Sequence, residues 1–282
     1  MPELPEVEVI RRYLDTAVRG RVIQNVQILR PQQIERPTPA DFAKLVTGQT
    51  ITGFARRGKY LGMHFLSGSR VIFHLRMTGS LVYEPSGRTA DPYARAVFSL
   101  SDGGLLVFAD VRTFGRLYGL NADESDAVIK GLASLGPEPL SEDFSPAYLE
   151  AAVKGRKQPI KSFLLDQRRV AGIGNIYADE ALFAAHIFPG RPAAGLTAAE
   201  CQHLQRAVRK VLQDGLKDGG TTFRDYRNGE GGHGHHQEHL FVYHREGQPC
   251  RICGAPIEKF TLGGRGTHFC PHCQPEDGSV SS

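Results

Sequence analysis

The chain has 282 residues, and its 34 Lys and Arg against 30 Asp and Glu give a formal net charge of +4. This length suits one large domain or two ordinary ones, and 32 Gly and 17 Pro are too few for a disordered, low-complexity polymer. No apolar stretch approaches the roughly 20 residues that cross a bilayer, the acidic start is unlike a secretory signal, and five cysteines are too few for a disulfide scaffold. We therefore expect a cytoplasmic protein without a membrane span.

The first half of the chain predicts one helix followed by strands. Val7, Ile10 and Leu14 recur at helical spacing, which predicts a helix over 6–18. From about residue 22 to 120 the chain carries short β-branched and aromatic runs: VIQNVQIL, TITGFARR, KYLGMHFL, RVIFHL, AVFSL and LLVFADV. Hairpin signals stand at 67–69 and 102–104. These features predict an antiparallel sandwich or barrel.

Beyond about residue 140 the pattern becomes helical. Ser145 before Pro146 predicts one helix start, and Thr197 with Glu200 has the form of a capping box for another. Cys201 opens the apolar stripe of that second helix, so we interpret it as a core residue rather than a ligand.

The other four cysteines form two Cys-x-x-Cys pairs with sixteen residues between them: Cys250, Cys253, Cys270 and Cys273. This spacing lets two knuckles close a tetrahedron around one Zn²⁺. The alternative of two disulfides is disfavoured in a reducing compartment, and His268 and His272 are interpreted as non-ligands. Because no ligand position is spare, the zinc is expected to be structural.

Two segments predict contacts with phosphate. Arg265 lies among the glycines of 263–266, in a turn that can approach a partner closely. The segment 154–169 holds six basic residues and one acid, although alone it could be only a solvated face. Asn175 follows in a glycine-bearing turn, where it can cap the next helix and, with the free amides there, bind an anion. Together these segments favour a DNA or RNA backbone as partner.

The N-terminus offers a nucleophile. Removal of Met1 would leave Pro2 as a secondary amine, which condenses with an aldehyde to a cationic iminium. Glu3 and Glu6, one helical turn apart, could donate a proton and orient the amine. Taken alone, the same residues also fit a plain helix entry with acids near the positive end of the helix dipole.

Several motifs together resemble the bacterial formamidopyrimidine-DNA glycosylases of the helix-two-turn-helix superfamily. They are MPELPEVE, RRGKYL, HLRMTG, DQRRVAGIGNIYADEALF, GGTTFRDY and GGRGTHFCPHCQ, and they run from residue 2 to 274. The resemblance implies an α+β fold with an N-terminal helix and antiparallel β-sandwich over 1–140. A helix-two-turn-helix domain with a base-covering loop would follow over 141–236, and a four-cysteine zinc-finger hairpin with a mobile tail over 237–282.

The resemblance also assigns roles to matching residues. Pro2 would attack C1′ of the damaged nucleotide, Glu3 would donate a proton to the base, and Glu6 would position the amine. Lys59 would assist β-elimination, and Arg265 would bind phosphates and assist δ-elimination. Met77, Arg112 and Phe114 would fill the space left by the everted nucleotide, with further DNA contacts from Tyr93, Arg156 and Asn175. The damaged base would be surrounded by Thr221, Thr222, Arg224 and Tyr226.

The sequence departs from the family pattern in places. Tyr93 stands where His is common, Thr113 where a second Arg is usual, and His244 where Gly is usual. The segment 229–239 carries His233, His235, His236 and His239 among glycines, which we interpret as a mobile lid, with a second metal site as the alternative. His74 could pack in the core or contact phosphate. Lys161 could contact phosphate or cover a helix.

We thus predict a monomeric, bifunctional DNA glycosylase and AP lyase of base excision repair, with structural zinc as its one cofactor. Its substrate would be double-stranded DNA with oxidised purines, chiefly 8-oxoguanine opposite cytosine and formamidopyrimidines, or with abasic sites. The alternatives are an endonuclease VIII-type glycosylase for oxidised pyrimidines and a zinc-finger protein that binds damaged DNA without cutting it.

Overall fold

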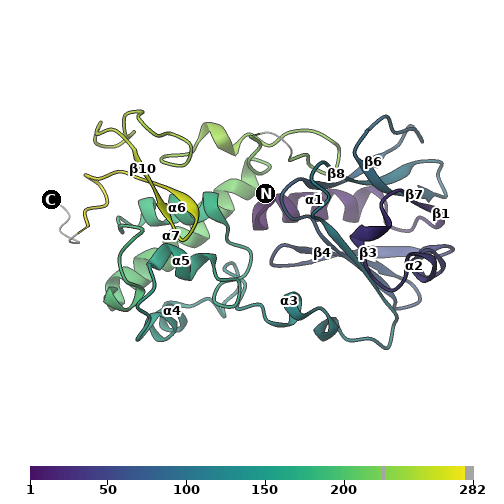
Figure 1. Cartoon of the computed structure of the whole chain (residues 1–282), viewed down its shortest axis with the longest axis horizontal. Coiled ribbons are helices and arrows are strands. Elements are labelled where there is room, and N and C mark those ends of the chain that lie inside the picture. The colour runs from purple at the N-terminus through teal and green to yellow at the C-terminus, as the bar shows by residue number, and fades with distance from the viewer. Residues whose placement is uncertain (224–225, 277–282) are drawn as a thin grey trace. The chain divides into compact units, whose positions relative to one another are not determined.

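The computed structural model describes residues 1–223 and 226–276 (Figure 1). The chain forms two compact units: Met1–Ala133 folds together with Gly215–Gln237, and Ser134–Asp214 folds together with Glu238–Ser282. The chain therefore returns to its first unit after building most of the second. The division into 1–140, 141–236 and 237–282 stays a prediction. In the described residues, no helix combines the length and apolar character needed to span a membrane.

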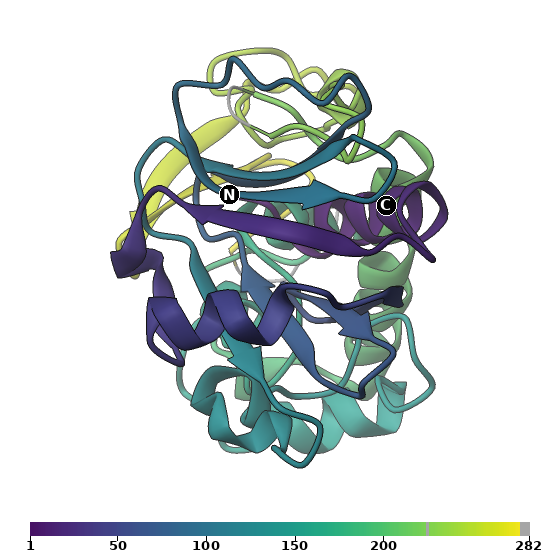
Figure 2. The ribbon, with the colours of Figure 1, turned by 90° about the vertical axis from the view of Figure 1, so that its right-hand side faces the viewer.

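The first unit is built around two sheets. The four-stranded sheet has the order β1 (Ile23–Ile28), β7 (Ala94–Leu100), β8 (Leu105–Asp110) and β6 (Gly79–Glu84). The five-stranded sheet has the order β2 (Ile34–Arg36), β9 (Arg116–Leu120), β5 (Arg70–His74), β4 (Tyr60–Phe65) and β3 (Ile51–Arg57). Neighbouring strands are antiparallel except for β2 and β9, which pair in parallel. The predicted sandwich is confirmed (Figure 2).

The two hairpin predictions are also confirmed. Residues 67–69 join β4 to β5, and residues 102–104 join β7 to β8. Gly68 and Gly103 have φ of +85° and +84°, a region that favours glycine and explains the turn residues. Strands β2, β6 and β9 were not predicted, because they are short or begin at residues such as Gly79 and Arg116 that do not signal a strand.

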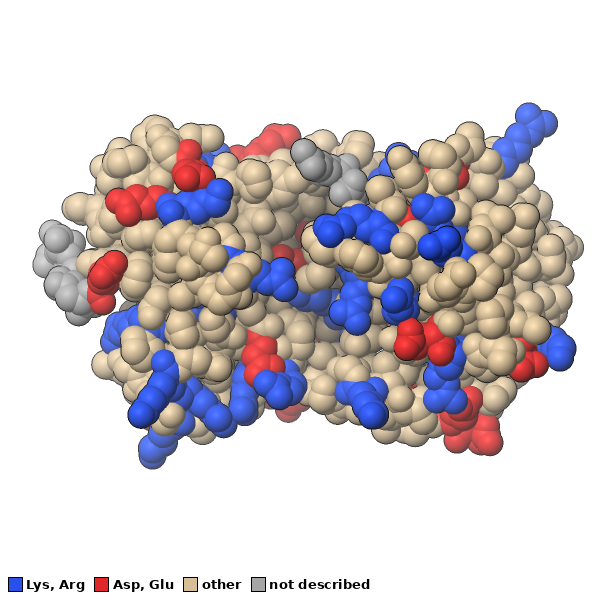
Figure 3. Space-filling model, viewed as in Figure 1, with Lys and Arg blue, Asp and Glu red and all other residues tan. Residues whose placement is uncertain are grey.

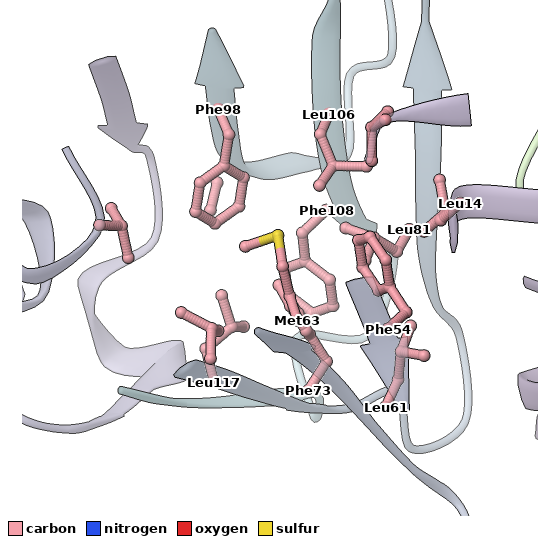
Figure 4. Packing of buried hydrophobic residues seen from close by; sticks show 14 of the residues in the cluster. Leu14, Phe54, Leu61, Met63, Phe73, Leu81, Phe98, Leu106, Phe108 and Leu117 are labelled. Carbon is pink, nitrogen blue, oxygen red and sulfur yellow. The ribbon is translucent and has the colours of Figure 1, made fainter. Parts of the chain in front are cut away.

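Two helices cover opposite sides of this sandwich. Helix α1 (Leu4–Ala17) contacts β3 and β6, the edge strands of the two sheets on one side. Helix α2 (Pro39–Val46) contacts β1 and β2, the edge strands on the other side. Leu14 of α1 packs beside Phe54 and Leu61 in the core between the sheets (Figure 4). Helix α1 begins earlier than the predicted 6–18, because Glu3 and Glu6 form a capping box at its start.

The second unit is helical. Its elements are α4 (Pro146–Val153), α5 (Ile160–Leu165), α6 (Asn175–Ala184), η3 (Ala193–Gly195) and most of α7 (Ala198–Lys217). Thr197 and Glu200 form the predicted capping box, with N–H···O distances of 3.2 and 2.7 Å. Cys201 is fully buried, as predicted. The shorter elements of the chain are η1 (Pro31–Gln33), η2 (Asp126–Val128), α3 (Lys130–Ala133) and η4 (His236–Glu238).

A hairpin completes the second unit. Strands β10 (Glu258–Leu262) and β11 (Arg265–Phe269) pair antiparallel around the turn at Gly263 and Gly264. Phe260 and Phe269 pack against Phe188, with ring centroids 5.7 and 5.1 Å from that ring. This aromatic cluster fixes the hairpin on the helical part of the unit.

Candidate active site

The start of α1 gathers two buried carboxylates next to Pro2. Pro2, Glu3 and Glu6 are buried, whereas Met1 is about half exposed. The backbone N–H of Glu3 donates to Oε2 of Glu6 at 2.8 Å. The residue that follows Pro2 is therefore held in place by the Glu6 carboxylate, which restricts where the nitrogen of Pro2 can lie.

The second oxygen of Glu6 holds the segment that returns to this unit after α7. The N–H of Thr221 donates to Oε1 of Glu6 at 2.8 Å. Gly220 has a φ of +86°, and an added Cβ there would lie 3.1 Å from both Cγ and Oε1 of Glu6. The close approach of this turn to the carboxylate therefore requires glycine.

Tyr226 lies beside the same carboxylate. Its hydroxyl donates to the carbonyl of Gly219 at 3.2 Å. Burial, aided by the charge of Glu6, raises the pKa of Tyr226 well above its ordinary range, so the hydroxyl stays a donor. Thr222 bridges the segment, since its Oγ1 accepts the N–H of Gly234 at 2.9 Å. Three base-pocket candidates thus lie near Glu6 or on the segment it anchors, while Arg224 lies outside the described residues.

Lys59 is a buried lysine in the turn between β3 and β4, after Gly58 with its φ of +55°. His74, at the end of β5, lies close enough to Lys59 for the charge of the lysine to affect the pKa of the imidazole. Burial, with the charges of Arg76 and Lys59, lowers the pKa of His74 to about 3. The ring is therefore neutral at pH 7, and its Nδ1 accepts the N–H of Arg76 at 3.2 Å. Its edge-on contact with Tyr60, at 4.5 Å between centroids, favours the packing role for His74 over a charged phosphate contact.

Met77, Arg112 and Phe114 form an exposed cluster at one end of the sandwich. Met77 and Phe114 are 40% and 46% exposed, although both are large and apolar. Arg112 links them: its Nη1 lies 3.2 Å from Sδ of Met77, and its guanidinium lies 4.8 Å from the centroid of the Phe114 ring. Exposed apolar side chains around one cation are suited to insertion into a base stack. The structure thus brings together the three residues that the resemblance grouped.

Asp110, at the end of β8, holds the two loops that carry this cluster. One oxygen accepts the hydroxyl of Thr78, whose Oγ1 in turn accepts the N–H of Arg112 at 3.0 Å. The other oxygen accepts the N–H of Gly115 and the side-chain amide of Gln33, both at 2.8 Å. Asp110 is 1% exposed. The sequence analysis did not identify Asp110 as a site residue. Its only signal in the sequence is its position as a single acidic residue directly after the apolar residues 105–109.

Tyr93 directly precedes β7 and lies beside Asp110 at the end of β8. Its carbonyl accepts the N–H of Asp110 at 2.9 Å, and its own N–H donates to Oδ1 of Asp91 at 2.8 Å. The phenol ring is 44% exposed and lies 5.7 Å from the guanidinium of Arg95. The backbone of Tyr93 is therefore tied to Asp110, and its ring is available to a partner.

The charges of the first unit are unevenly distributed over its surface. On the face of this unit that Figure 3 shows, Lys and Arg side chains gather into a group. A local group of cations attracts phosphate even where the formal net charge of the chain is only +4. This face is therefore suited to a nucleic-acid backbone.

The second unit contains the remaining phosphate candidates. Asn175 does not cap α6, contrary to the sequence prediction: Gly174 is the N-cap, and Asn175 is the first helical residue. Its Nδ2 instead donates to the carbonyl of Gly266 at 2.9 Å, next to Arg265 on the hairpin. Arg156 is exposed in the loop between α4 and α5. Asn175 and Arg265 are thus brought together, and Arg156 lies on a separate loop.

Four cysteines gather at the base of the hairpin. The Sγ atoms of Cys250 and Cys273 lie 3.9 Å apart, those of Cys253 and Cys270 lie 3.4 Å apart, and all four fall within 4.8 Å. Four thiolates around a tetrahedral Zn²⁺ would be about 3.8 Å apart, so the geometry fits one zinc ion. Although burial opposes it, backbone N–H groups of Cys253 and Ile252 lower the pKa of Cys250 to about 7. Zinc here would shape the finger without an open position for chemistry.

The acidic pair of α6 docks the finger on the helices. Glu180 accepts the N–H groups of Phe241, Val242 and Tyr243 at 2.8 to 2.9 Å. Asp179 accepts the N–H and the Nδ1 of His268, at 3.0 and 3.2 Å. His268 therefore engages Asp179, as expected for a residue that is not a zinc ligand.

The glycine-rich segment after residue 227 is tied to the sandwich. The carbonyl of Gly229 accepts the N–H of Tyr83 at 3.0 Å. Asn228 Oδ1 accepts the N–H groups of Glu230 and Gly232, which closes the turn. This part of the proposed lid therefore has a defined backbone path against β6.

One histidine of the same segment, His236, is buried. Its Nδ1 lies 2.8 Å from Oδ2 of Asp218, which directly follows α7. This contact holds the segment at the end of that helix. The lid and the second metal site both stay predictions.

Comparisons with known proteins agree with this geometry. Residues 1–117 match the formamidopyrimidine-DNA glycosylase N-terminal domain, residues 135–227 match the H2TH domain of the same enzymes, and residues 247–275 match a zinc finger found in FPG and IleRS. The glycosylase N-terminal domain, the H2TH domain and the four-cysteine finger together define a DNA-repair glycosylase with a structural zinc site.

Individual relatives agree along nearly their whole length. The chain is 50% identical to the formamidopyrimidine-DNA glycosylase of Moorella thermoacetica over 259 residues, covering 92% of this chain and 94% of that one. The crystal structure of the MutM (Fpg) protein of Thermus thermophilus shares 43% identity and a TM-score of 0.88, covering 98% and 99% of the two chains. The complex of Lactococcus lactis Fpg with abasic-site DNA has a TM-score of 0.90 at 36% identity, covering 97% and 99%. The chain belongs to the formamidopyrimidine-DNA glycosylase family.

Proposed function

We propose that the chain is a bifunctional DNA glycosylase and AP lyase for oxidised purines, acting through the amine of Pro2 after Met1 is removed. The observation that carries the proposal is the pair of buried carboxylates, Glu3 and Glu6, beside Pro2, with Glu6 also bound to Thr221. A nucleophile, a proton donor and a base-facing segment are thus organised by one carboxylate.

Each group has a chemical task. The nitrogen of Pro2 attacks C1′ as the bond from C1′ to the base breaks, and Glu3 supplies the proton that the departing base takes up. The bond from C1′ to the ring oxygen O4′ then breaks, O4′ takes up the proton that the Pro2 nitrogen has lost, and the nitrogen forms a double bond to C1′. The resulting iminium withdraws electrons, so that loss of a C2′ proton breaks the bond to the 3′ phosphate oxygen. A second elimination breaks the bond to the 5′ phosphate oxygen. Lys59 assists the first elimination and Arg265 the second, and the product is a one-nucleotide gap with phosphates at both ends.

The exposed cluster replaces the everted nucleotide. Phe114 wedges between bases, Met77 fills the space pliably, and Arg112 hydrogen-bonds the orphaned cytosine. Eversion costs a few kcal/mol, and these contacts offset that cost. Asn175, Arg156 and Tyr93 contact the DNA backbone, and Thr221, Thr222, Arg224 and Tyr226 surround the base.

Solved relatives support this substrate class. The Lactococcus lactis enzyme has been solved with DNA containing Fapy-dG, and MutM has been solved with DNA containing carbocyclic 8-oxo-G. The Lactococcus enzyme has also been solved with an oxidised pyrimidine, so we keep oxidised pyrimidines as the second candidate substrate. We place the enzyme in the cytoplasm, acting as a monomer on chromosomal DNA.

Borohydride trapping tests the proposal. Parent protein, with Met1 removal verified by intact mass, is mixed with duplexes that carry 8-oxoguanine, an oxidised pyrimidine or an abasic site. We expect a covalent adduct with 8-oxoguanine and abasic DNA, and none when the amine is blocked by acetylation. In Glu3→Gln, we expect excision of 8-oxoguanine to fall while trapping on a preformed abasic site persists.

The controls separate the candidate functions. No adduct with any duplex would overturn the lyase assignment and leave a DNA-binding protein. An adduct with the oxidised pyrimidine alone would replace the purine assignment with the second candidate.

A further inference from the structure

We propose that Lys161 is a positioning residue that holds the fingertip Arg265 and the helix residue Asn175 in one phosphate grip. The inference rests on the proposed phosphate role of Arg265 and Asn175. Lys161 belongs to the basic segment 154–169, yet it is fully buried. Its task is therefore internal, and it does not itself contact DNA.

The ammonium of Lys161 is surrounded by acceptors. Its Nζ lies 2.7 Å from Oδ1 of Asp179 and donates to the carbonyl of Gly266 and to Oγ1 of Thr267, both at 2.9 Å. Two of these contacts are hydrogen bonds and the third is an ion pair, so the ammonium is held by acceptors inside the second unit. Because the side chain is fully buried among these acceptors, it is not placed to contact a phosphate, which was one of the two roles that the sequence left open.

These contacts converge on the peptide next to Arg265. The carbonyl of Gly266 accepts from Lys161 and also from Nδ2 of Asn175, at 2.9 Å. Asp179, one helical turn after Asn175 on α6, accepts the N–H of His268 at 3.0 Å. Residues 266–268 of β11 are therefore fixed to both α5 and α6, immediately beside the fingertip.

The anchor is separate from the zinc site. The cysteine ligands nearest to Arg265 in sequence are Cys270 and Cys273, beyond the far end of β11. Zinc would hold the base of the hairpin, whereas Lys161 and Asp179 hold the half of β11 that leads to its tip. A buried ion pair is rarely needed for stability alone, because an apolar pair of similar volume serves as well. Its hydrogen bonds to a specific carbonyl make positioning the better explanation.

The proposal predicts a selective defect. In Lys161→Met, the δ-elimination step assisted by Arg265 should slow roughly 10-fold or more, because a displacement of about 1 Å suffices for such losses. Borohydride trapping through Pro2 should stay within about 2-fold of the parent. Affinity for duplexes with an uncleavable tetrahydrofuran abasic analogue should fall as it does in Arg265→Ala, and the double variant should be no weaker than Arg265→Ala.

Matched variants keep the test decisive. Lys161→Met combined with Asp179→Leu removes the buried charge pair as a unit, and Asp179→Asn retains its shape. The control is Lys210→Met, which breaks the exposed ion pair with Asp214 on α7 and should change neither product ratio nor affinity. Zinc content and thermal unfolding are measured for each variant.

Two results would overturn the positioning role of Lys161. A folded, zinc-bound Lys161 variant with parental δ-elimination and parental affinity would overturn the proposal. Loss of zinc or of folding in all the Lys161 and Asp179 variants would overturn it too, since the pair would then serve the fold alone. If the parent gives no δ-product, the proposed function fails, and the affinity comparison on tetrahydrofuran DNA still tests the positioning role.

Discussion

Thr221 donates its backbone N–H to Oε1 of Glu6 across 215 positions of sequence, at a distance of 2.8 Å. The same carboxylate accepts the N–H of Glu3 at 2.8 Å. One buried side chain therefore joins the residue next to the proposed nucleophile, Pro2, to the segment proposed to face the damaged base. Positioning of the amine and of the base should consequently respond together to changes at Glu6.

Glu6→Gln should weaken both functions of this junction. The Glu6 carboxylate accepts the N–H groups of Glu3 and Thr221, whereas the Gln amide offers an oxygen to one of them and an NH₂ group to the other. One N–H group therefore loses its acceptor, which costs about 1 to 3 kcal/mol of stability. We expect excision of 8-oxoguanine to slow roughly 10- to 100-fold, because the amine and the base are both displaced. Single-turnover excision and urea unfolding measure the two effects. Parental excision in a destabilised variant would contradict the positioning role.

Gly220→Ala tests the close approach to Glu6. Its φ of +86° and a Cβ placed 3.1 Å from the carboxylate should destabilise the protein by about 1 to 2 kcal/mol and slow excision. Gly20→Ala is the control, because Gly20 has a φ of +81° and nothing within 4 Å of an added Cβ. It should share the backbone strain but keep parental excision. Equal excision by the two variants would show that contact with Glu6 is unimportant.

Asp110→Ala should disorganise the exposed cluster of Met77, Arg112 and Phe114. Removing this carboxylate leaves the buried donors of Thr78 and Gly115 without their acceptor, a cost of about 2 to 4 kcal/mol. We expect weaker discrimination between cytosine and other bases opposite 8-oxoguanine. Excision from the four duplexes that differ in the opposite base measures it. The exposed Asp123→Ala is the control and should retain parental discrimination.

His74 should make folding sensitive to acid. Its pKa falls from 6.5 to about 3 on folding, so below pH 6.5 the unfolded chain binds a proton that the folded chain does not. Stability should therefore fall as the pH falls from 6.5 toward 3, by at most about 1.4 kcal/mol per pH unit from this residue. His74→Gln removes the titration, and urea unfolding at several pH values should show a shallower loss. Parallel curves for parent and variant would refute this.

Removal of zinc should weaken DNA binding by the hairpin of the second unit. Chelation, or Cys253→Ser, should release the base of the hairpin and reduce affinity for abasic-site DNA roughly 10-fold or more. Zinc content and fluorescence anisotropy are measured together. Cys201→Ala is the control, because Cys201 is buried away from the four clustered cysteines and should leave one zinc ion per chain.

The sequence predicted the elements whose residues carry a local signal. Alternating strands with glycine turns, the helix stripe of α1 and the Thr197 capping box are all encoded within a few residues. Strand β2 pairs in parallel with β9, far away in sequence, so its three residues carry no such signal. Likewise α2 begins at a Thr38 cap and Pro39 inside what reads as a strand region.

The candidate site also combines residues that the sequence identifies and residues whose role depends on contacts far away in the sequence. Motif matching grouped Met77, Arg112 and Phe114, but the residue that holds their loops, Asp110, depends on contacts with Gln33 and Gly115 that only the folded chain shows. Asn175 was expected to cap its own helix, because a local partner is the default for that residue type. Its partner is instead the carbonyl of Gly266, 91 positions away.

The first unit consists of two separate stretches of chain, so a fragment confined to either stretch lacks part of it. A fragment ending at Ala133 would contain the proposed nucleophile, both carboxylates and every strand of the two sheets, yet it would lack Thr221 and Tyr226. Such a truncated protein would expose apolar surface where Tyr226 normally completes the core. Dissection of this enzyme into halves should therefore retain residues 215–237 with the N-terminal piece, for example through a short engineered linker.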